Sequence, residues 1–184
     1  MESYHKALLE LARQSIAEAF GGAVIDKEYY LTNYPQLQNE GASFVTLTLD
    51  KALRGCIGSI IAHRSLFEDI ISNAKSAAFK DPRFPPLTQE EFEKVVIEVS
   101  LLTPPKRVEF HSAEDLKQKI RPKVDGVIVK QGSLQATFLP QVWEELPTFE
   151  VFFEHLFAKA GISDPSKGIE VYTYEVEKFS EDEM

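Results

Sequence analysis

Cysteine is almost absent from this chain: Cys56 is the single one in 184 residues. A disulfide within the chain is therefore excluded. No apolar run is long enough to cross a bilayer, so no membrane association is predicted. The segment from Met1 to Lys6 also lacks the basic-then-apolar pattern of a secretory signal. Together these absences predict a cytoplasmic protein.

Positive charge is also in short supply, with 20 Lys and Arg against 29 Asp and Glu and a net charge of -9. Duplex nucleic acid is held mainly by cations at its phosphates, so it is not predicted as a partner. The sequence has no Cys-x-x-Cys, His-x-His or His-Glu-x-x-His pattern, and no glycine loop that would cradle phosphates before a helix. We therefore predict neither a bound metal nor a cofactor.

The residues that are present suit a globular chain, with 43% hydrophobic residues in a length typical of one domain. Apolar periodicity predicts helices over residues 4–20, 66–79, 113–120 and 148–160, and a short helix after Thr88. A loop is expected to carry Tyr29, Tyr30, Tyr34 and Pro35. Alternation predicts strands over residues 44–49, 53–61, 95–102, 126–131, 134–139 and 169–179. This mixture has no regular βαβ rhythm, which favours an α+β fold with a mixed or antiparallel sheet and flanking helices.

The segment Leu53-Arg-Gly-Cys-Ile-Gly58 is the main candidate for chemistry. Strand alternation would place Arg54, Cys56 and Gly58 on one face. A cation beside a thiol favours the nucleophilic thiolate, and a residue without a side chain would let a ligand approach. Three roles for Cys56 stay open: a nucleophile, a ligand contact or a small buried core residue. We expect Arg54 to contribute little to stability, unless it is buried and paired with a carboxylate such as that of Glu98.

Further candidates surround this segment. His63 is the nearest histidine and could serve as the base for Cys56, or could be an ordinary loop residue. Glu98 and Ser100 would share one strand face, where they could line a pocket with Glu98 as acid or base, or could sit on solvated surface. Asp81 and Arg83 lie in a proline-rich loop, where they could pair with each other, or Arg83 could bind a ligand carboxylate or phosphate.

Several segments, taken together, resemble the AMMECR domain family. The hexapeptide at residues 53–58 is similar to the signature of that family, and the likeness extends over almost the whole chain as a single domain, residues 1–184. The other similar segments are Phe44-Val-Thr-Leu47, Ala77-Ala-Phe-Lys-Asp-Pro-Arg-Phe-Pro-Pro-Leu87, Ile97-Glu-Val-Ser-Leu-Leu-Thr-Pro-Pro105, Phe138-Leu-Pro-Gln-Val-Trp143 and Lys159-Ala-Gly161.

The resemblance implies a compact α+β fold in which a larger and a smaller subdomain surround a cleft at the signature. Bacterial and archaeal members are called AmmeMemoRadiSam system protein A, which implies a Memo-like protein and a radical S-adenosylmethionine protein as partners. No settled activity follows from the resemblance.

The predicted site has Cys56, His63 and Glu98 as catalytic residues. Its ligand-binding residues are Arg54, Gly55, Gly58, Ser100, Asp81 and Arg83.

Two functions stay open. The protein could be an enzyme, or an enzyme subunit, that acts on a small molecule or a protein modification. It could instead be a module without catalytic activity that docks one of the two partners.

Overall fold

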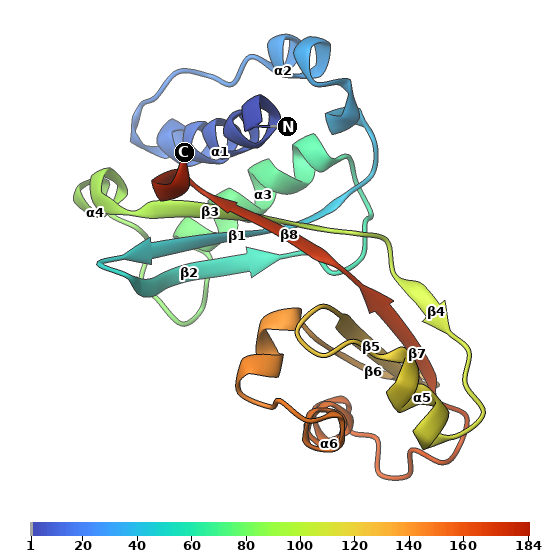
Figure 1. The fold of residues 1–184 in the computed structure, drawn as a ribbon. Coiled ribbons are helices and arrows are strands. Elements are labelled where there is room, and N and C mark those ends of the chain that lie inside the picture. The colour runs from blue at the N-terminus through green and yellow to red at the C-terminus, as the bar shows by residue number, and fades with distance from the viewer. Residues whose placement is uncertain (1) are drawn as a thin grey trace. The chain divides into compact units, whose positions relative to one another are not determined.

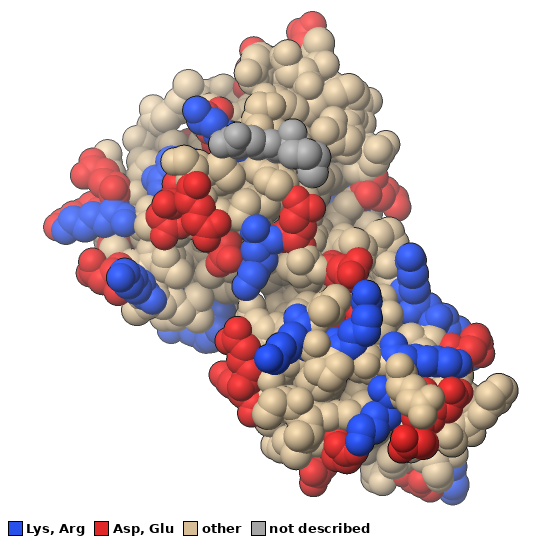
Figure 2. Space-filling model, in the orientation of Figure 1, with Lys and Arg blue, Asp and Glu red and all other residues tan. Residues whose placement is uncertain are grey.

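A computed structural model describes residues 2–184 and shows an α+β protein, as predicted (Figure 1). The chain forms two compact units. The larger unit takes the chain up to Leu102 and again from Glu177 to Met184. The smaller unit is Thr103–Val176. Each unit contains its own four-stranded sheet and helices. Figure 2 shows that acidic and basic side chains both occur on the visible face of each unit.

The first helix of the larger unit is α1 (Glu2–Ala17), which continues as a 3-10 turn, η1 (Glu18–Phe20). Its apolar stripe, which includes Leu8, Leu11 and Ile16, is fully buried in the core that it shares with α3 (Leu66–Phe79). Gly21 ends the helix in the left-handed conformation, with φ 84°. The helix predicted over residues 4–20 is confirmed.

The predicted loop around Tyr29 is wrong. This segment forms a short helix, α2 (Lys27–Asn33), and a 3-10 turn, η2 (Pro35–Gln38). Asp26 accepts a hydrogen bond from the Tyr29 backbone N–H at 3.1 Å, and Pro35 begins η2 with a preset φ. These local signals start a helix and a 3-10 turn in the segment that was predicted to be a loop.

The sheet of the larger unit has the order β2-β1-β3-β8. Its strands are β1 (Ala42–Leu49), β2 (Ala52–Gly58), β3 (Val96–Leu102) and β8 (Val176–Ser180). Asp50 and Lys51 join β1 to β2, both with positive φ (52° and 67°), as a tight primed hairpin requires. One sheet face carries core residues such as Val45, Leu47 and Val99 and packs under α1 and α3. Helix α4 (Gln89–Lys94) leads into β3.

The smaller unit has a second antiparallel sheet of order β4-β7-β5-β6. Its strands are β4 (Lys106–Val108), β5 (Gly126–Gln131), β6 (Leu134–Phe138) and β7 (Glu170–Tyr174). Its helices are α5 (Ala113–Lys119), the 3-10 turn η3 (Pro140–Glu144) and α6 (Phe149–Ala160). Trp143 stacks on Phe152 with ring centroids 3.7 Å apart, at the centre of this core.

The long strand predicted over residues 169–179 is two strands. β7 pairs within the sheet of the smaller unit, and β8 belongs to the sheet of the larger unit, followed by the turn η4 (Glu181–Glu183). Between them, Glu175 is hydrogen-bonded through its backbone to Thr103. The amino-acid pattern is continuous through this break, so the change of sheet leaves no local sequence signal. Residues 2–184 include no helix that is both long and apolar enough to span a membrane.

Candidate functional site

The signature strand β2 lies at an edge of the larger sheet, and Cys56 is part of a polar row across it. Thr46 of β1 is the cross-strand neighbour of Cys56 on one side and of Glu98 in β3 on the other. Cross-strand neighbours project from the same face of a sheet. The Thr46 hydroxyl lies 3.2 Å from the Cys56 sulfur. All three side chains are half-buried, on the face opposite the core.

A second row lies beside the first. Phe44 pairs with Gly58 on β2 and with Ser100 on β3. Ser100 is buried, whereas Phe44 is half-buried. The sheet therefore brings Cys56, Gly58, Glu98 and Ser100 from the predicted set onto one face.

Arg54 lies apart from these rows, where the alternation of β2 is interrupted. Leu47 pairs with Gly55 but Thr48 pairs with Leu53, so Arg54 is the extra residue of a β-bulge. It is buried, at 6% exposure. Its guanidinium forms an ion pair with Glu91 of α4 and donates to the Pro85 carbonyl at 2.8 Å. Arg54 therefore joins the signature strand to the segment that leads into α4, and its carboxylate partner is not Glu98.

Asp81 and Arg83 cover the free edge of β2 at Cys56. The Cys56 N–H donates to the buried Asp81 carboxylate at 3.0 Å, and Arg83 donates to the Cys56 carbonyl at 3.2 Å. The two side chains pair with each other at 2.7 Å, and this pairing holds the pKa of Asp81 well below its usual range. The loop thus satisfies backbone groups that an edge strand would otherwise leave open. The Arg83 side chain is still 55% exposed.

The electrostatic environment of Cys56 favours the protonated thiol. Burial is the largest influence and raises the pKa of the Cys56 thiol. The Thr46 hydroxyl and Arg83 lower this pKa, and Asp81 and Glu98 raise it. The expected activation by Arg54 is wrong, because the guanidinium of Arg54 is engaged by Glu91 and the cation that acts on the thiol is Arg83.

His63 makes no hydrogen bond to the thiol in the described residues. It is exposed, and its Nδ1 lies 3.2 Å from the Ile61 carbonyl in the loop after β2. Within residues 2–184, no hydrogen bond joins His63 to Cys56 or Glu98. The same part of the chain has no cluster of three or more His, Cys, Asp or Glu side chains that could hold a metal ion.

The two signature glycines are in contact with the protein itself. A Cβ atom on Gly55 would lie 2.1 Å from the carbonyl oxygen of Ala77 in α3. A Cβ atom on Gly58 would lie 2.2 Å from the ring of Phe44. The side-chain space that a ligand was expected to use is therefore filled by the helix backbone at Gly55 and by an aromatic ring at Gly58.

A buried polar network next to the signature strand was missed by the sequence analysis. The fully buried carboxylate of Asp69 accepts hydrogen bonds from Ser43, Ser59, Arg64 and Asn73. A carboxylate satisfied in this way fixes the ends of β1 and β2 against α3. The available signal was an acidic residue at a core-facing position of the predicted helix, between its apolar residues.

Comparisons with known proteins agree over nearly the whole chain. The model of the AMMECR1 family matches residues 9–179. Protein MJ0810 of Methanocaldococcus jannaschii is 37% identical over 95% of this chain and 92% of its own length. A protein of Methanosarcina acetivorans is 39% identical over 99% of this chain and 94% of its own. The crystal structure of the uncharacterized protein PH0010 from Pyrococcus horikoshii superposes with a TM-score of 0.82 and 34% identity, covering 98% of this chain and 92% of that one.

Proposed function

The chain belongs to the AMMECR1 family, and from this premise we propose that the sheet face around Cys56 is its binding surface for a small molecule or a modified protein. We further propose that the protein acts as component A of the AmmeMemoRadiSam system, in the cytoplasm. The cleft between subdomains at the signature, which the resemblance implies, stays a prediction.

One observation carries this proposal: the row in which Thr46 lies between Cys56 and Glu98. A carboxylate, a hydroxyl and a thiol offer a negative charge, a hydrogen-bond donor and a soft, polarisable contact within one row. They project from the face opposite the core and are half-buried. Such a surface suits a ligand that presents hydrogen-bond donors or a cation to Glu98.

In this proposal Cys56 contacts the ligand as an un-ionised thiol. The raised pKa of Cys56 lowers the thiolate fraction at neutral pH, and the thiolate is the form that attacks an electrophile. Glu98 is then the candidate acid or base if a reaction takes place, and Ser100 lies on the same face as a further polar group. Asp81 and Arg83 hold the edge of the strand in place.

A second candidate function is docking of the Memo-like protein or the radical S-adenosylmethionine protein without catalysis. Two exposed residues in or beside the signature strand support it. Leu53, the first residue of the signature, is 44% exposed, and the side chain of Arg83, which donates to the Cys56 carbonyl, is 55% exposed. Arginine is enriched at protein interfaces and among the residues that contribute most to binding, and Leu53 would add an apolar contact. Leu53 and Arg83 would then be the residues that a partner contacts.

The experiment compares Glu98→Gln with Leu53→Ser, and uses Glu93→Gln on the exposed surface of α4 as the matched control. Each variant is tested for complementation of a deletion strain, for melting temperature and for co-purification with the two partner proteins. Ligand binding at the sheet face predicts that Glu98→Gln loses complementation while its melting temperature and co-purification are retained. Docking predicts that Leu53→Ser loses co-purification. Full complementation by the folded Glu98→Gln variant would overturn the first proposal.

A further inference from the structure

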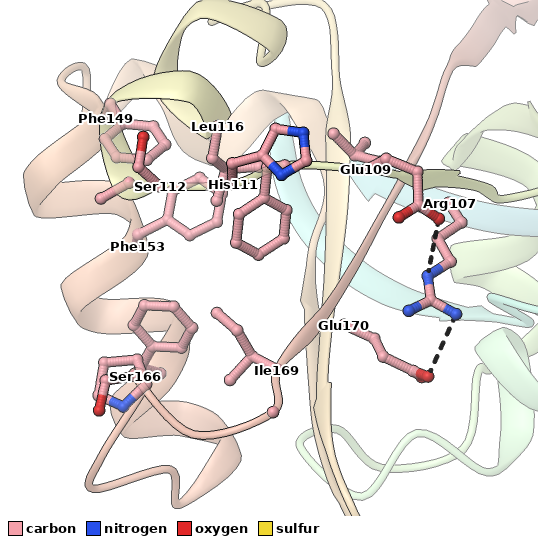
Figure 3. Close-up of a pocket in the computed structure, with 16 residues that line it drawn as sticks. Arg107, Glu109, His111, Ser112, Leu116, Phe149, Phe153, Ser166, Ile169 and Glu170 are labelled. Atoms are coloured by element: carbon pink, nitrogen blue, oxygen red, sulfur yellow. Dashed lines mark ion pairs between the residues drawn. The ribbon is translucent and has the colours of Figure 1, made fainter.

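The smaller unit contains a cavity of about 600 Å³ that includes none of the signature residues (Figure 3). It is bounded by β4, by the start of α5, by one side of α6 and by the loop before β7. Cavities of about 300 to 1,000 Å³ are typical of sites for small organic ligands. The cavity is therefore large enough for a molecule of one or two rings.

Aromatic side chains form its apolar wall. Phe149, Phe153 and Phe157 lie at intervals of one helical turn along α6 and all face the cavity. The ring centroids of Phe149 and Phe153 are 4.5 Å apart, and those of Phe153 and Phe157 are 5.8 Å apart. Phe110 completes the aromatic set from the loop after β4. Ring faces of this kind stack on flat apolar groups and attract cations.

Charged groups occupy another part of the lining. Arg107 lies 3.4 Å from Glu109 and 3.5 Å from Glu170, so two carboxylates share one guanidinium. Tight charged hydrogen bonds usually measure about 2.7 to 2.9 Å between donor and acceptor. Both Arg107 distances are about half an ångström longer than this, so the two ion pairs are loose. The group has a net negative charge and can still accept a hydrogen bond from a ligand. Figure 3 shows Phe149 and Phe153 on one side of the cavity and these charged residues on the other.

We propose that this cavity is a second binding site, specific for small molecules with a flat apolar body and a cationic amine end. The ring would lie against the α6 phenylalanines, and the ammonium group would replace part of the interaction that Arg107 makes with Glu109 and Glu170. The site is separate from the proposed sheet-face surface, because every residue that lines it belongs to the smaller unit.

The test titrates the full chain with two probes of similar size, 2-phenylethylamine and phenylacetate, followed by backbone amide NMR. We expect the amine to shift signals in residues 107–116, 149–157 and 165–170, and to bind about fivefold or more tightly than the anion, because the charged side of the cavity is acidic. Equal affinity for the two probes would overturn the charge assignment. Shifts confined to other segments, or no binding at millimolar concentration, would overturn the site.

Two variants and two controls test which residues the probes contact. Glu109→Gln alters a side chain that is 81% exposed, so the fold should be retained while the preference for the amine falls. Ala113→Trp should weaken both probes by filling the cavity from the start of α5. Glu154→Gln changes an exposed residue of α6 outside the lining and should leave both affinities unchanged. Glu98→Gln should also leave them unchanged, so failure of this proposal is distinguishable from failure of the proposed sheet-face function.

Discussion

The guanidinium of Arg54 and the carboxylate of Glu91 form a two-point ion pair, with Nε 2.8 Å from Oε2 and Nη2 3.0 Å from Oε1. Glu91 also closes the capping box of α4 with Thr88. The signature arginine and the start of α4 therefore share one carboxylate. The expectation that Arg54 contributes little to stability is not supported by this geometry, which fits the alternative of a buried, paired arginine.

The first prediction is that Arg54→Ala lowers the free energy of unfolding by about 3 kcal/mol, because it leaves a carboxylate without its main partner in a largely buried place. Glu91→Gln should cost somewhat less, about 2 kcal/mol, because the amide oxygen of glutamine can still accept a hydrogen bond from the Arg54 guanidinium. Urea denaturation of the purified variants measures both values.

Glu90→Gln is the matched control for this first prediction. Glu90 precedes Glu91 on the same helix, but its side chain is 82% exposed and pairs with Lys94 at 3.4 Å. Removing this exposed pair should cost less than about 0.5 kcal/mol. If Glu90→Gln and Glu91→Gln destabilised the protein equally, helix α4 itself would be responsible and the ion pair with Arg54 would not.

The second prediction concerns acid pH. The hydrogen bonds from Arg54 lower the pKa of Glu91 from 4.5 to about 2 in the folded protein. Because the folded pKa lies below the unfolded one, this stabilisation is complete above about pH 4.5 and is lost as the pH falls toward 2. The difference in unfolding free energy between wild type and Glu91→Gln should therefore shrink across that window and stay constant from pH 5 to 7. A difference that does not change with pH would show that the charge of Glu91 is irrelevant.

The third prediction separates the two signature glycines. A methyl group at Gly55 would meet the backbone oxygen of Ala77, which cannot move without shifting α3. A methyl group at Gly58 would meet the Phe44 ring, a half-buried side chain that can turn aside. Gly55→Ala should cost about 3 kcal/mol and Gly58→Ala about 1 kcal/mol in urea denaturation. A larger loss at Gly58 would mean that the Phe44 ring is held more rigidly than the helix backbone.

The faces of the individual strands could be predicted from the sequence because strand alternation is local, whereas the row of Cys56, Thr46 and Glu98 across three strands was not predicted. The patterns around Thr46, Cys56 and Glu98 each fix which side chains share a face, and the hairpin through Asp50 and Lys51 follows from short-range turn geometry. The interpretation of Arg54 depended on unbroken alternation. A bulge inserts one residue and ends that alternation. Glycines such as Gly55 and Gly58 often mark a bulge in a strand, but they do not identify which residue is the extra one.

Other features depend on residues far apart in the chain. The ion pair of Arg54 and Glu91 spans 37 positions, and the hydrogen bond from Ser43 to Asp69 spans 26. Periodicity identifies which face of an element is buried, but it does not identify the partner across the core. The roles of Gly55 and Gly58 also required knowledge of what packs against them, since glycine tolerates either a ligand or a neighbouring backbone.

The fourth prediction concerns the reactivity of Cys56, which any thiol reagent reports without ambiguity because it is the single cysteine. Burial raises its thiol pKa, so iodoacetamide should label the folded protein more slowly at pH 7 than the urea-unfolded chain. The rate should climb as the pH rises through the raised pKa. Arg83→Ala removes a cation that lowers this pKa and should slow labelling further, unless the opened loop exposes the sulfur.

Glu98→Gln should change the pKa of the Cys56 thiol in the direction opposite to Arg83→Ala, and this completes the test. Glu98 raises the thiol pKa through its negative charge, so neutralising it should shift the pH profile of labelling toward lower pH. Glutamine has nearly the same shape as glutamate, so exposure of the sulfur should not change. Mass spectrometry of the labelled fraction against time, from pH 6 to 10, measures the profile for wild type and variant.

Rapid labelling of the folded wild type at pH 7 would show an activated thiolate and would restore Cys56 as a candidate nucleophile. An unchanged profile in Glu98→Gln would show that this carboxylate does not act on the thiol.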